Sequence, residues 1–268
     1  MSVQIYYFSG TGNSLHVAQE LKRRVPNTNL VPIISALKKD QIVTEAEIVG
    51  MVFPIHAHTF PLVVKEFLQK VDFQFSSYIF ALSTRLCAEK VFSDMNKILK
   101  RKGRTLDASF AVETPINYIP LFSVPTQEEV KKLELELQKR LDEIQPIITN
   151  KQTRYEKTGL LVALLAHTIF RVNTFLFQKT RYFGLEKAFY ADDKCIGCGT
   201  CQEICLSNKI NLVDKKPIWN DDIDCTFCFA CISYCPVQAI QAKRKRTTKK
   251  GRYHHPAISA KDIAMQKQ

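Results

Sequence analysis

Short apolar segments alternate with amphipathic segments through residues 1–125. Five apolar runs predict strands at 3–8, 30–34, 48–53, 78–82 and 110–112. The segments between them carry helix signals, and the first of these has its apolar residues on one helical face. Strands that alternate with helices indicate an α/β fold in which a doubly wound parallel sheet has helices on both faces.

Residues 126–150 predict one long helix. Thr126 and Glu129 have the spacing of a capping box, and apolar residues recur on one face after them. Residues 158–180 are unusually apolar, but His167 and Arg171 interrupt the run too early for a membrane span. We therefore expect an amphipathic connecting helix, and a helix on a membrane surface is the disfavoured alternative.

Eight of the nine cysteines lie between residues 195 and 235. Two C-x2-C-x2-C-x3-C motifs, thirty residues apart, contain Cys195, Cys198, Cys201, Cys205, Cys225, Cys228, Cys231 and Cys235. Two consecutive x2 gaps, repeated, favour iron–sulfur clusters over structural zinc, which usually combines separated C-x2-C pairs. Clustered cysteines without a secretory signal also favour a reducing compartment, so we expect a cytoplasmic protein.

This segment resembles the bacterial two-cluster [4Fe–4S] ferredoxins. The resemblance implies that the fourth cysteine of each motif binds the cluster of the other motif. One cluster then takes Cys195, Cys198, Cys201 and Cys235, and the other takes Cys225, Cys228, Cys231 and Cys205. The family has Pro after the last cysteine of each motif, as in Pro236, whereas Leu206 follows Cys205. Aromatic residues line the second loop, so burial predicts a lower potential for its cluster.

A Gly-rich hexapeptide joins the first predicted strand to the first predicted helix. Its backbone N–H groups and hydroxyls converge at a helix N-terminus, which is an anion cradle. The spacing excludes a nucleotide-hydrolysing P-loop and a dinucleotide fingerprint, so we expect no direct use of a nicotinamide cofactor. The hexapeptide is similar to the FMN-phosphate loop of flavodoxins, which implies an FMN site formed by Ser9, Gly10, Thr11, Gly12, Asn13 and Ser14.

Two later loops are expected near the flavin ring, at the carboxyl ends of the strands. The first contains Pro54, Ile55, His56 and His58, and the second contains Thr84. Related sequences often have an aromatic residue in the first loop and glycines in the second, where this chain has Arg85 and Leu86. An exposed loop role for either histidine, and weakened flavin binding, are the alternatives that these departures leave open. Cys87 is interpreted as a small buried hydrophobic residue.

Taken as a whole, the sequence resembles the family of flavodoxin-like domains fused to a two-cluster ferredoxin domain. The resemblance implies an FMN-binding domain at 1–150, a helical connector at 151–187, a two-cluster domain at 188–242 and a basic tail at 243–268. The tail has seven Lys or Arg between residues 243 and 252 and is expected to be a solvated, disordered extension. Docking to an acidic partner protein or to RNA is the alternative.

The formal charge of +12 is reduced by the predicted cofactors. Two clusters with their thiolates would remove about four charges and a flavin phosphate about two, so nucleic-acid binding is disfavoured. The sequence predicts an electron-transfer protein that passes single electrons between FMN, two [4Fe–4S] clusters and a partner redox protein. A flavin-dependent reductase of a small acceptor, and a nucleic-acid-binding module with structural or sensory clusters, are the alternatives.

Overall fold

A computed structural model describes residues 1–85, 89–156, 174–177, 179–243 and 247–268. Five strands form one parallel sheet, in the order β2-β1-β4-β6-β7. They are β1 (Val3–Tyr7), β2 (Thr28–Pro32), β4 (Ile48–Phe53), β6 (Tyr78–Ser83) and β7 (Ala108–Ala111). Counted along the chain, this order is 2-1-3-4-5, which is the flavodoxin-like form of a doubly wound sheet. The predicted fold class is therefore confirmed.

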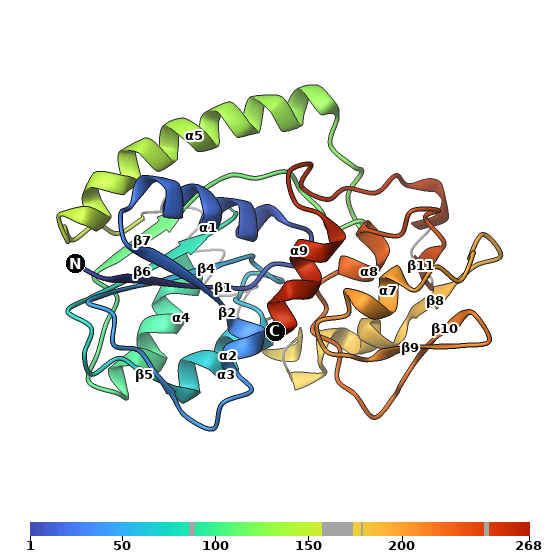
Figure 1. The fold of residues 1–268 in the computed structure, drawn as a ribbon, viewed down its shortest axis with the longest axis horizontal. Coiled ribbons are helices and arrows are strands. Elements are labelled where there is room, and N and C mark those ends of the chain that lie inside the picture. The colour runs from blue at the N-terminus through green and yellow to red at the C-terminus, as the bar shows by residue number, and fades with distance from the viewer. Residues whose placement is uncertain (86–88, 157–173, 178, 244–246) are drawn as a thin grey trace.

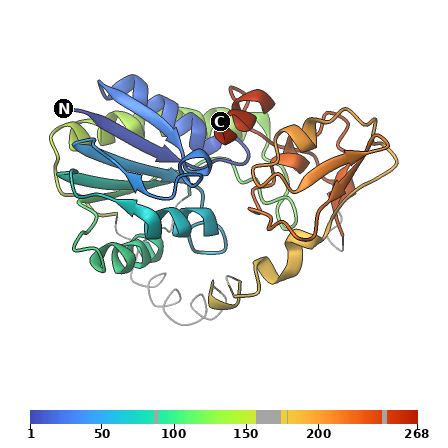
Figure 2. The same cartoon turned by 60° about the horizontal axis from the view of Figure 1, so that its bottom comes forward.

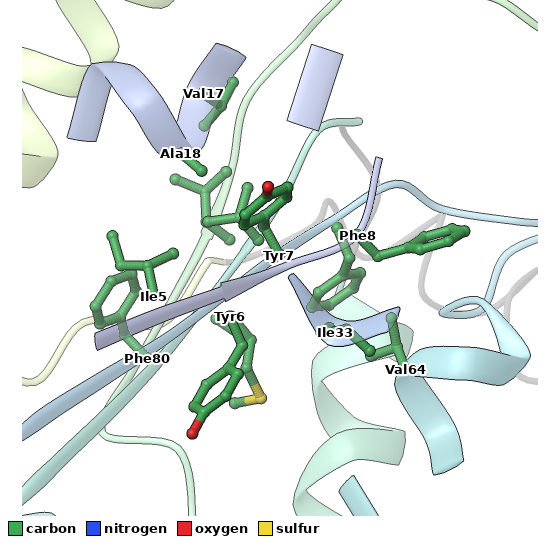
Figure 3. Close-up of a cluster of buried hydrophobic side chains, with 14 of the residues drawn as sticks. Ile5, Tyr6, Tyr7, Phe8, Val17, Ala18, Ile33, Val64 and Phe80 are labelled. Atoms are coloured by element: carbon green, nitrogen blue, oxygen red, sulfur yellow. The ribbon is translucent and has the colours of Figure 1, made fainter. Parts of the chain in front are cut away.

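Helices cover both faces of the sheet (Figure 1). Helices α1 (Asn13–Arg24) and α5 (Gln127–Thr149) lie on one face, and α3 (Leu62–Lys70) and α4 (Glu89–Lys100) lie on the other. Every residue of β4 and β6 is buried, as expected of central strands that are covered on both sides. In Figure 3, Tyr7 of β1 points towards α1 while Tyr6 points to the opposite side, where its ring lies 4.5 Å from that of Phe67.

The capping box predicted for the long helix is present at the start of α5. The Thr126 hydroxyl accepts from the Glu129 N–H, and the Glu129 carboxylate accepts from the Thr126 N–H. Three short elements were not predicted from the sequence: α2 (Ile33–Ala36), β3 (Ile42–Val43) and β5 (Val71–Asp72). Two-residue strands and a single helical turn are too short to produce a periodic pattern.

The cysteine-rich half is a separate small α+β unit beside the sheet (Figure 2). Its elements are η1 (Tyr182–Lys187), β8 (Phe189–Ala191), α7 (Thr200–Glu203), β9 (Ile210–Val213), β10 (Lys216–Trp219), α8 (Ala230–Ser233) and β11 (Ile240–Ala242). Strand β9 pairs with β10, and β8 pairs with β11, both antiparallel. Helices α7 and α8 begin thirty residues apart, as do β9 and β11, so the duplication seen in the sequence is also structural.

The part of the basic tail that the structure describes is folded. Residues 247–268 form η2 (Thr247–Lys249), α9 (Ala260–Ala264) and η3 (Met265–Lys267), and α9 lies between the sheet and the cysteine-rich half (Figure 1). We call residues 253–268 the C-terminal segment. Tyr253, Ile258 and Ile263 in this segment are buried. The expectation of a disordered extension is wrong for residues 247–268, because these apolar side chains follow the basic run and anchor it.

Most of the predicted connecting helix at 158–180, with His167 and Arg171, lies outside the described residues. Residues 174–177 are helical. Within the described part of the chain, no helix is both long enough and apolar enough to cross a membrane.

Candidate redox site

The eight clustered cysteines lie in and around the two short helices α7 and α8, and all of them are free thiols. Four of them, Cys195, Cys198, Cys201 and Cys235, line one pocket. Cys235 belongs to the second motif, whereas the other three belong to the first. The pocket therefore combines three thiols from one motif with the fourth thiol of the other, as the resemblance to ferredoxins implies.

The other four thiols form a second group. Burial, and to a smaller extent the neighbouring Cys228 and Cys205, raise the pKa of Cys225 to about 12. Burial also raises the pKa of Cys231 well above its usual range, and Cys228, Cys225 and Cys205, together with Cys201 of the first group, add to the effect. Four crowded, buried thiols are unfavourable as bare thiolates, but coordination by metal ions stabilises the deprotonated form. Both groups of thiols therefore fit iron–sulfur clusters.

Backbone N–H groups point at several of the sulfur atoms. The N–H groups of Lys209 and Ala239 donate to Cys205 Sγ at 3.3 Å and to Cys235 Sγ at 3.2 Å. These two donors occupy equivalent positions of the duplication. The N–H of Phe227 donates to its own motif, to Sγ of Cys225 at 3.3 Å. Such bonds favour negative charge on sulfur and hence a ligated thiolate.

The two cysteine loops have the same backbone conformation with different residues. Gly197 and Gly199 of the first loop have φ angles of 69° and 83°. The equivalent residues of the second loop are Phe227 and Phe229, with φ angles of 54° and 61°. The left-handed region is unfavourable for a bulky residue, so the two phenylalanines are held there by their surroundings.

Those surroundings are aromatic and reach into the flavodoxin-like half. The ring of Phe227 stacks on that of Tyr182 at 4.5 Å and lies 6.4 Å from the ring of His56. The ring of Phe229 meets that of Tyr118 edge to face at 5.3 Å. Both His56 and Tyr118 follow strands of the parallel sheet. The second cysteine loop therefore faces the carboxyl ends of those strands.

The Gly-rich loop, residues 9–14, leads into α1 and is buried throughout. Gly12 is the residue before the helix, with a φ angle of 99°, and the first turn of α1 has no acidic residue. The backbone N–H groups of Gly10, Thr11 and Gly12 have no acceptor in the part of the chain that the structure describes. Buried donors without acceptors at a helix N-terminus fit an anion such as a phosphate.

The side chains of this loop already have protein partners. The Thr11 hydroxyl accepts from the side-chain amide of Asn117, and Asn13 Nδ2 donates to the carbonyl of Pro115 at 3.0 Å. The hydroxyls of Ser14 and Thr84 are 2.9 Å apart, so the structure brings together two residues that the sequence placed in one site. An anion would therefore be held mainly by the backbone N–H groups of the loop.

The loop that contains Pro54, Ile55, His56 and His58 follows β4. His56 and Thr59 exchange backbone hydrogen bonds of 2.8 and 2.9 Å, which close a tight turn. The Nδ1 atom of His56 is buried without a hydrogen-bond partner among the described residues, and burial lowers the pKa of this imidazole to about 4. His58 is exposed. Leu86 and Cys87, at the other expected ring loop, lie outside the described residues.

The Gly-rich loop and the second cysteine loop touch. A Cβ atom on Gly10 would lie 1.9 Å from the carbonyl oxygen of Cys228, so the two backbones are in direct contact. A Cβ atom on Gly12 would lie 2.8 Å from Cβ of His255 and 3.1 Å from the hydroxyl of Tyr234. Gly10 is therefore required by close approach, and not by its φ angle.

The C-terminal segment completes the Gly-rich loop. The side-chain amide of Gln266 accepts from the Ser9 N–H at 3.0 Å and donates to the Ser9 carbonyl at 2.8 Å. The N–H of His255 donates to the carbonyl of Thr11 at 2.8 Å, and the Tyr253 hydroxyl donates to Asn13 Oδ1 at 2.9 Å. The sequence analysis missed these residues, because nothing in their types or spacing distinguishes them.

Two histidines and a carboxylate meet beside this loop. The Nε2 atom of His16 lies 2.9 Å from Glu134 Oε1, Nε2 of His255 lies 3.6 Å from Glu134 Oε2, and the two rings stack at 3.8 Å. These three residues could hold a metal ion by proximity. However, Nδ1 of His255 accepts from the Ala257 N–H at 3.3 Å, so the ring proton of neutral His255 is on Nε2 and faces the carboxylate. We interpret the group as a polar contact between the C-terminal segment, α1 and α5, in which His16 is hydrogen-bonded to Glu134 and His255 lies within ion-pair distance of it.

Burial, and to a smaller extent the neighbouring His16, lower the pKa of His255 to about 4. His255 is therefore neutral when the C-terminal segment is packed against the Gly-rich loop.

Comparison with known proteins identifies the cysteine-rich half. Residues 194–240 match the model of the 4Fe-4S dicluster domain family. A ferredoxin from Methanothermococcus thermolithotrophicus is 36% identical over 53 residues, which are 19% of this chain and 88% of that protein.

The solved structures are more distant. Rubredoxin oxygen:oxidoreductase from Desulfovibrio gigas is matched over 56% of this chain and 36% of its own, with 16% identity and a TM-score of 0.34. This chain thus spans about a third of that protein. A flavodoxin from the domain Archaea is matched over 54% of this chain and 99% of its own, with 11% identity and a TM-score of 0.31. The flavodoxin-like assignment rests on the strand order of this chain.

Proposed function

The chain belongs, through residues 194–240, to the two-cluster [4Fe–4S] ferredoxin family, and we propose that it passes single electrons between FMN and a partner redox protein. Iron–sulfur clusters make the C-terminal half an electron-transfer domain in general terms. The finer proposal concerns the ligands of each cluster, the flavin and the order of the carriers.

We assign Cys195, Cys198, Cys201 and Cys235 to the first cluster, and Cys205, Cys225, Cys228 and Cys231 to the second. The pocket that contains the first four thiols supports this division, and so does the effect of Cys205 and Cys228 on the pKa values of Cys225 and Cys231. The N–H groups that donate to Cys205 and Cys235 would stabilise the thiolates.

The FMN phosphate is proposed to bind the backbone N–H groups of Gly10, Thr11 and Gly12, which have no acceptor among the described residues. His56 would lie near the ring, and its unpartnered Nδ1 is available to accept a hydrogen bond from it. FMN, when bound, supplies both one-electron and two-electron chemistry. The two histidines and Thr84 stay predicted ring or phosphate neighbours.

One contact carries the proposed order of the carriers. Gly10 touches the carbonyl of Cys228, so the phosphate loop and a ligand of the second cluster are adjacent in space. The aromatic side chains of Phe227 and Tyr182 continue this contact towards His56. The second cluster is therefore the inner one, next to the flavin.

The first cluster would be the outer one, where a partner docks. Cys198 is exposed, and the neighbouring Ile196 has 64% of its surface exposed. An exposed apolar side chain beside an exposed ligand suits a transient redox contact, because such interfaces are small.

Anaerobic purification followed by cofactor analysis tests the proposal. We expect about eight irons and about one FMN per chain, as two cubanes and one flavin loop require. The variant Cys198→Ser should slow exchange with an external redox protein while the flavin still exchanges electrons with the inner cluster. The variant Cys228→Ser should abolish that internal exchange. Eight irons without flavin would contradict the FMN assignment and leave the ferredoxin assignment standing.

A further inference from the structure

A fully buried lysine lies beside the second group of thiols. Lys209 has 2% of its surface exposed, and its Nζ donates to the carbonyls of Asn220 at 2.5 Å and Ile223 at 2.7 Å. Within the described residues, its only carboxylate neighbour at ion-pair distance is Asp221, at 4.0 Å and on a side chain that is 81% exposed. These carbonyl groups accept from two of the three N–H donors of the ammonium group but leave its charge uncompensated.

A buried cation of this kind needs a counter-charge. Removing an ammonium ion from water costs several kcal/mol unless an opposite charge repays it, and a single exposed carboxylate repays little. The thiols of the second group are the other candidates. The backbone N–H of Lys209 bonds to Cys205 Sγ, and its ammonium group bonds to the carbonyl of Ile223, two residues before Cys225.

The internal duplication supplies a built-in comparison. The residue equivalent to Lys209 is Ala239, which is also fully buried and donates the equivalent bond, to Cys235 Sγ. A cation does approach Cys235, but it comes from outside the repeat: the half-buried Arg252, whose charge is also shared with Asp192. The buried ammonium is therefore a feature that one repeat has and the other lacks.

We propose that Lys209 is a fixed counter-charge that raises the reduction potential of the cluster held by Cys205, Cys225, Cys228 and Cys231. This inference rests on the proposed ligand assignment. Reduction adds one electron and no proton, so the negative charge beside Lys209 grows by one unit. A cation held in a poorly solvated site favours that extra charge. Lys209 thus opposes the lowering of the potential that the aromatic burial of this loop predicts.

An anaerobic potentiometric titration with dithionite and mediators, followed by EPR spectroscopy, tests this in the holoprotein. The variant Cys198→Ser identifies which midpoint belongs to the inner cluster. We expect Lys209→Met to lower that midpoint by at least about 59 mV, which is a tenfold change in a one-electron equilibrium, and to leave the outer midpoint in place. The exposed Lys261, changed to Met, removes the same formal charge and should move neither midpoint.

Two clusters with unmoved midpoints in Lys209→Met, or two midpoints that fall equally, would overturn the inference and leave the proposed function intact. A wild-type protein with only four irons would instead contradict the ligand assignment. Lys209→Met could also lose its irons, so a second variant avoids the buried site. Asp221→Asn removes the exposed carboxylate and should raise the inner midpoint slightly, and a fall would contradict the proposal.

Discussion

The two cysteine loops share one backbone conformation but differ in what surrounds them. The first loop places Gly197 and Gly199 at left-handed φ angles and leaves Cys198 exposed. The second places Phe227 and Phe229 at similar angles and buries both rings against the flavodoxin-like half.

The energies explain why phenylalanine is tolerated there. A left-handed conformation costs a bulky residue about 1–2 kcal/mol. Burial of a phenylalanine side chain contributes about 1.5–3 kcal/mol, and each good aromatic pair adds about 0.5–1.5 kcal/mol. The ring of Phe229 meets three others, those of Tyr118, Phe189 and Phe227. Packing therefore outweighs backbone strain, and the duplicated unit has kept its metal-binding geometry while one copy became an interface.

The largest effect is expected from Gly10→Ala, which breaks the contact that only the second loop makes. The new Cβ would meet the backbone of Cys228, which cannot move without displacing a proposed ligand of the second cluster. We expect a loss of more than about 4 kcal/mol in the opening free energy of the interface. Anaerobic native-state hydrogen exchange at residues 225–235 measures this loss.

Gly199→Ala is the matched control for that substitution. Gly199 has a left-handed φ angle, but no atom lies within 4 Å of a Cβ added to it. It should cost about 1 kcal/mol, from strain alone. Equal losses in the two variants would show that the Gly10 contact contributes nothing.

An intermediate effect is expected from exchanging the equivalent residues Phe229 and Gly199. Phe229→Gly relieves backbone strain but removes a buried ring, for a net loss of about 2–3 kcal/mol. Gly199→Phe adds strain at an open site and should cost only about 1–2 kcal/mol. Native-state hydrogen exchange on each single variant measures the loss in opening free energy. A larger loss for Gly199→Phe than for Phe229→Gly would contradict the interpretation.

The smallest effect is expected from a fall in pH, which weakens the packing of the C-terminal segment against the second loop. The hydroxyl of Tyr234, next to Cys235, donates to the carbonyl of Ile258 in the C-terminal segment, whereas the equivalent residue of the first repeat is Ile204. The pKa of His255 is about 4 when docked and about 6.5 when free, so the free segment binds the proton more readily. Docking is thus fully favourable above pH 6.5 and weakens as the pH falls towards 4, by about 2 kcal/mol between pH 7 and pH 5.

Hydrogen exchange of residues 253–268 as a function of pH measures this loss, after correction for intrinsic exchange rates. The groups that face the His255 ring are His16 and Glu134, with His254 beside it. His255→Asn should flatten the pH dependence of this segment while exchange at residues 195–205 stays unchanged. A pH dependence that survives the substitution would assign the effect to another group.

The sequence was sufficient wherever a pattern has a single physical solution. Apolar runs such as 48–53 could only be covered strands, Thr126 and Glu129 could form a capping box, and the cysteine spacing indicated the family. The proximity of Ser14 and Thr84 also followed from the expected fold, because the segments after β1 and β6 both lie at the carboxyl end of the sheet.

The rest depended on contacts between distant residues. No local pattern predicts that Phe227 adopts a left-handed conformation, since its own preference is against it. The burial of Lys209 contradicts the usual behaviour of lysine and depends on the carbonyls of Asn220 and Ile223, which come from a later part of the chain. The run of basic residues suggested disorder at the C-terminus, because charge density there obscured the few apolar residues that anchor it.

The bridge between Ser9 and Gln266 joins residues separated by 257 positions. Contacts of such long range form late in folding, because the entropy of closing the intervening loop must be overcome first. The Gly-rich loop is made early in synthesis yet gains its final partners only when the last described residues have folded against it. Occupancy of that loop would therefore report that the entire polypeptide has reached its native topology.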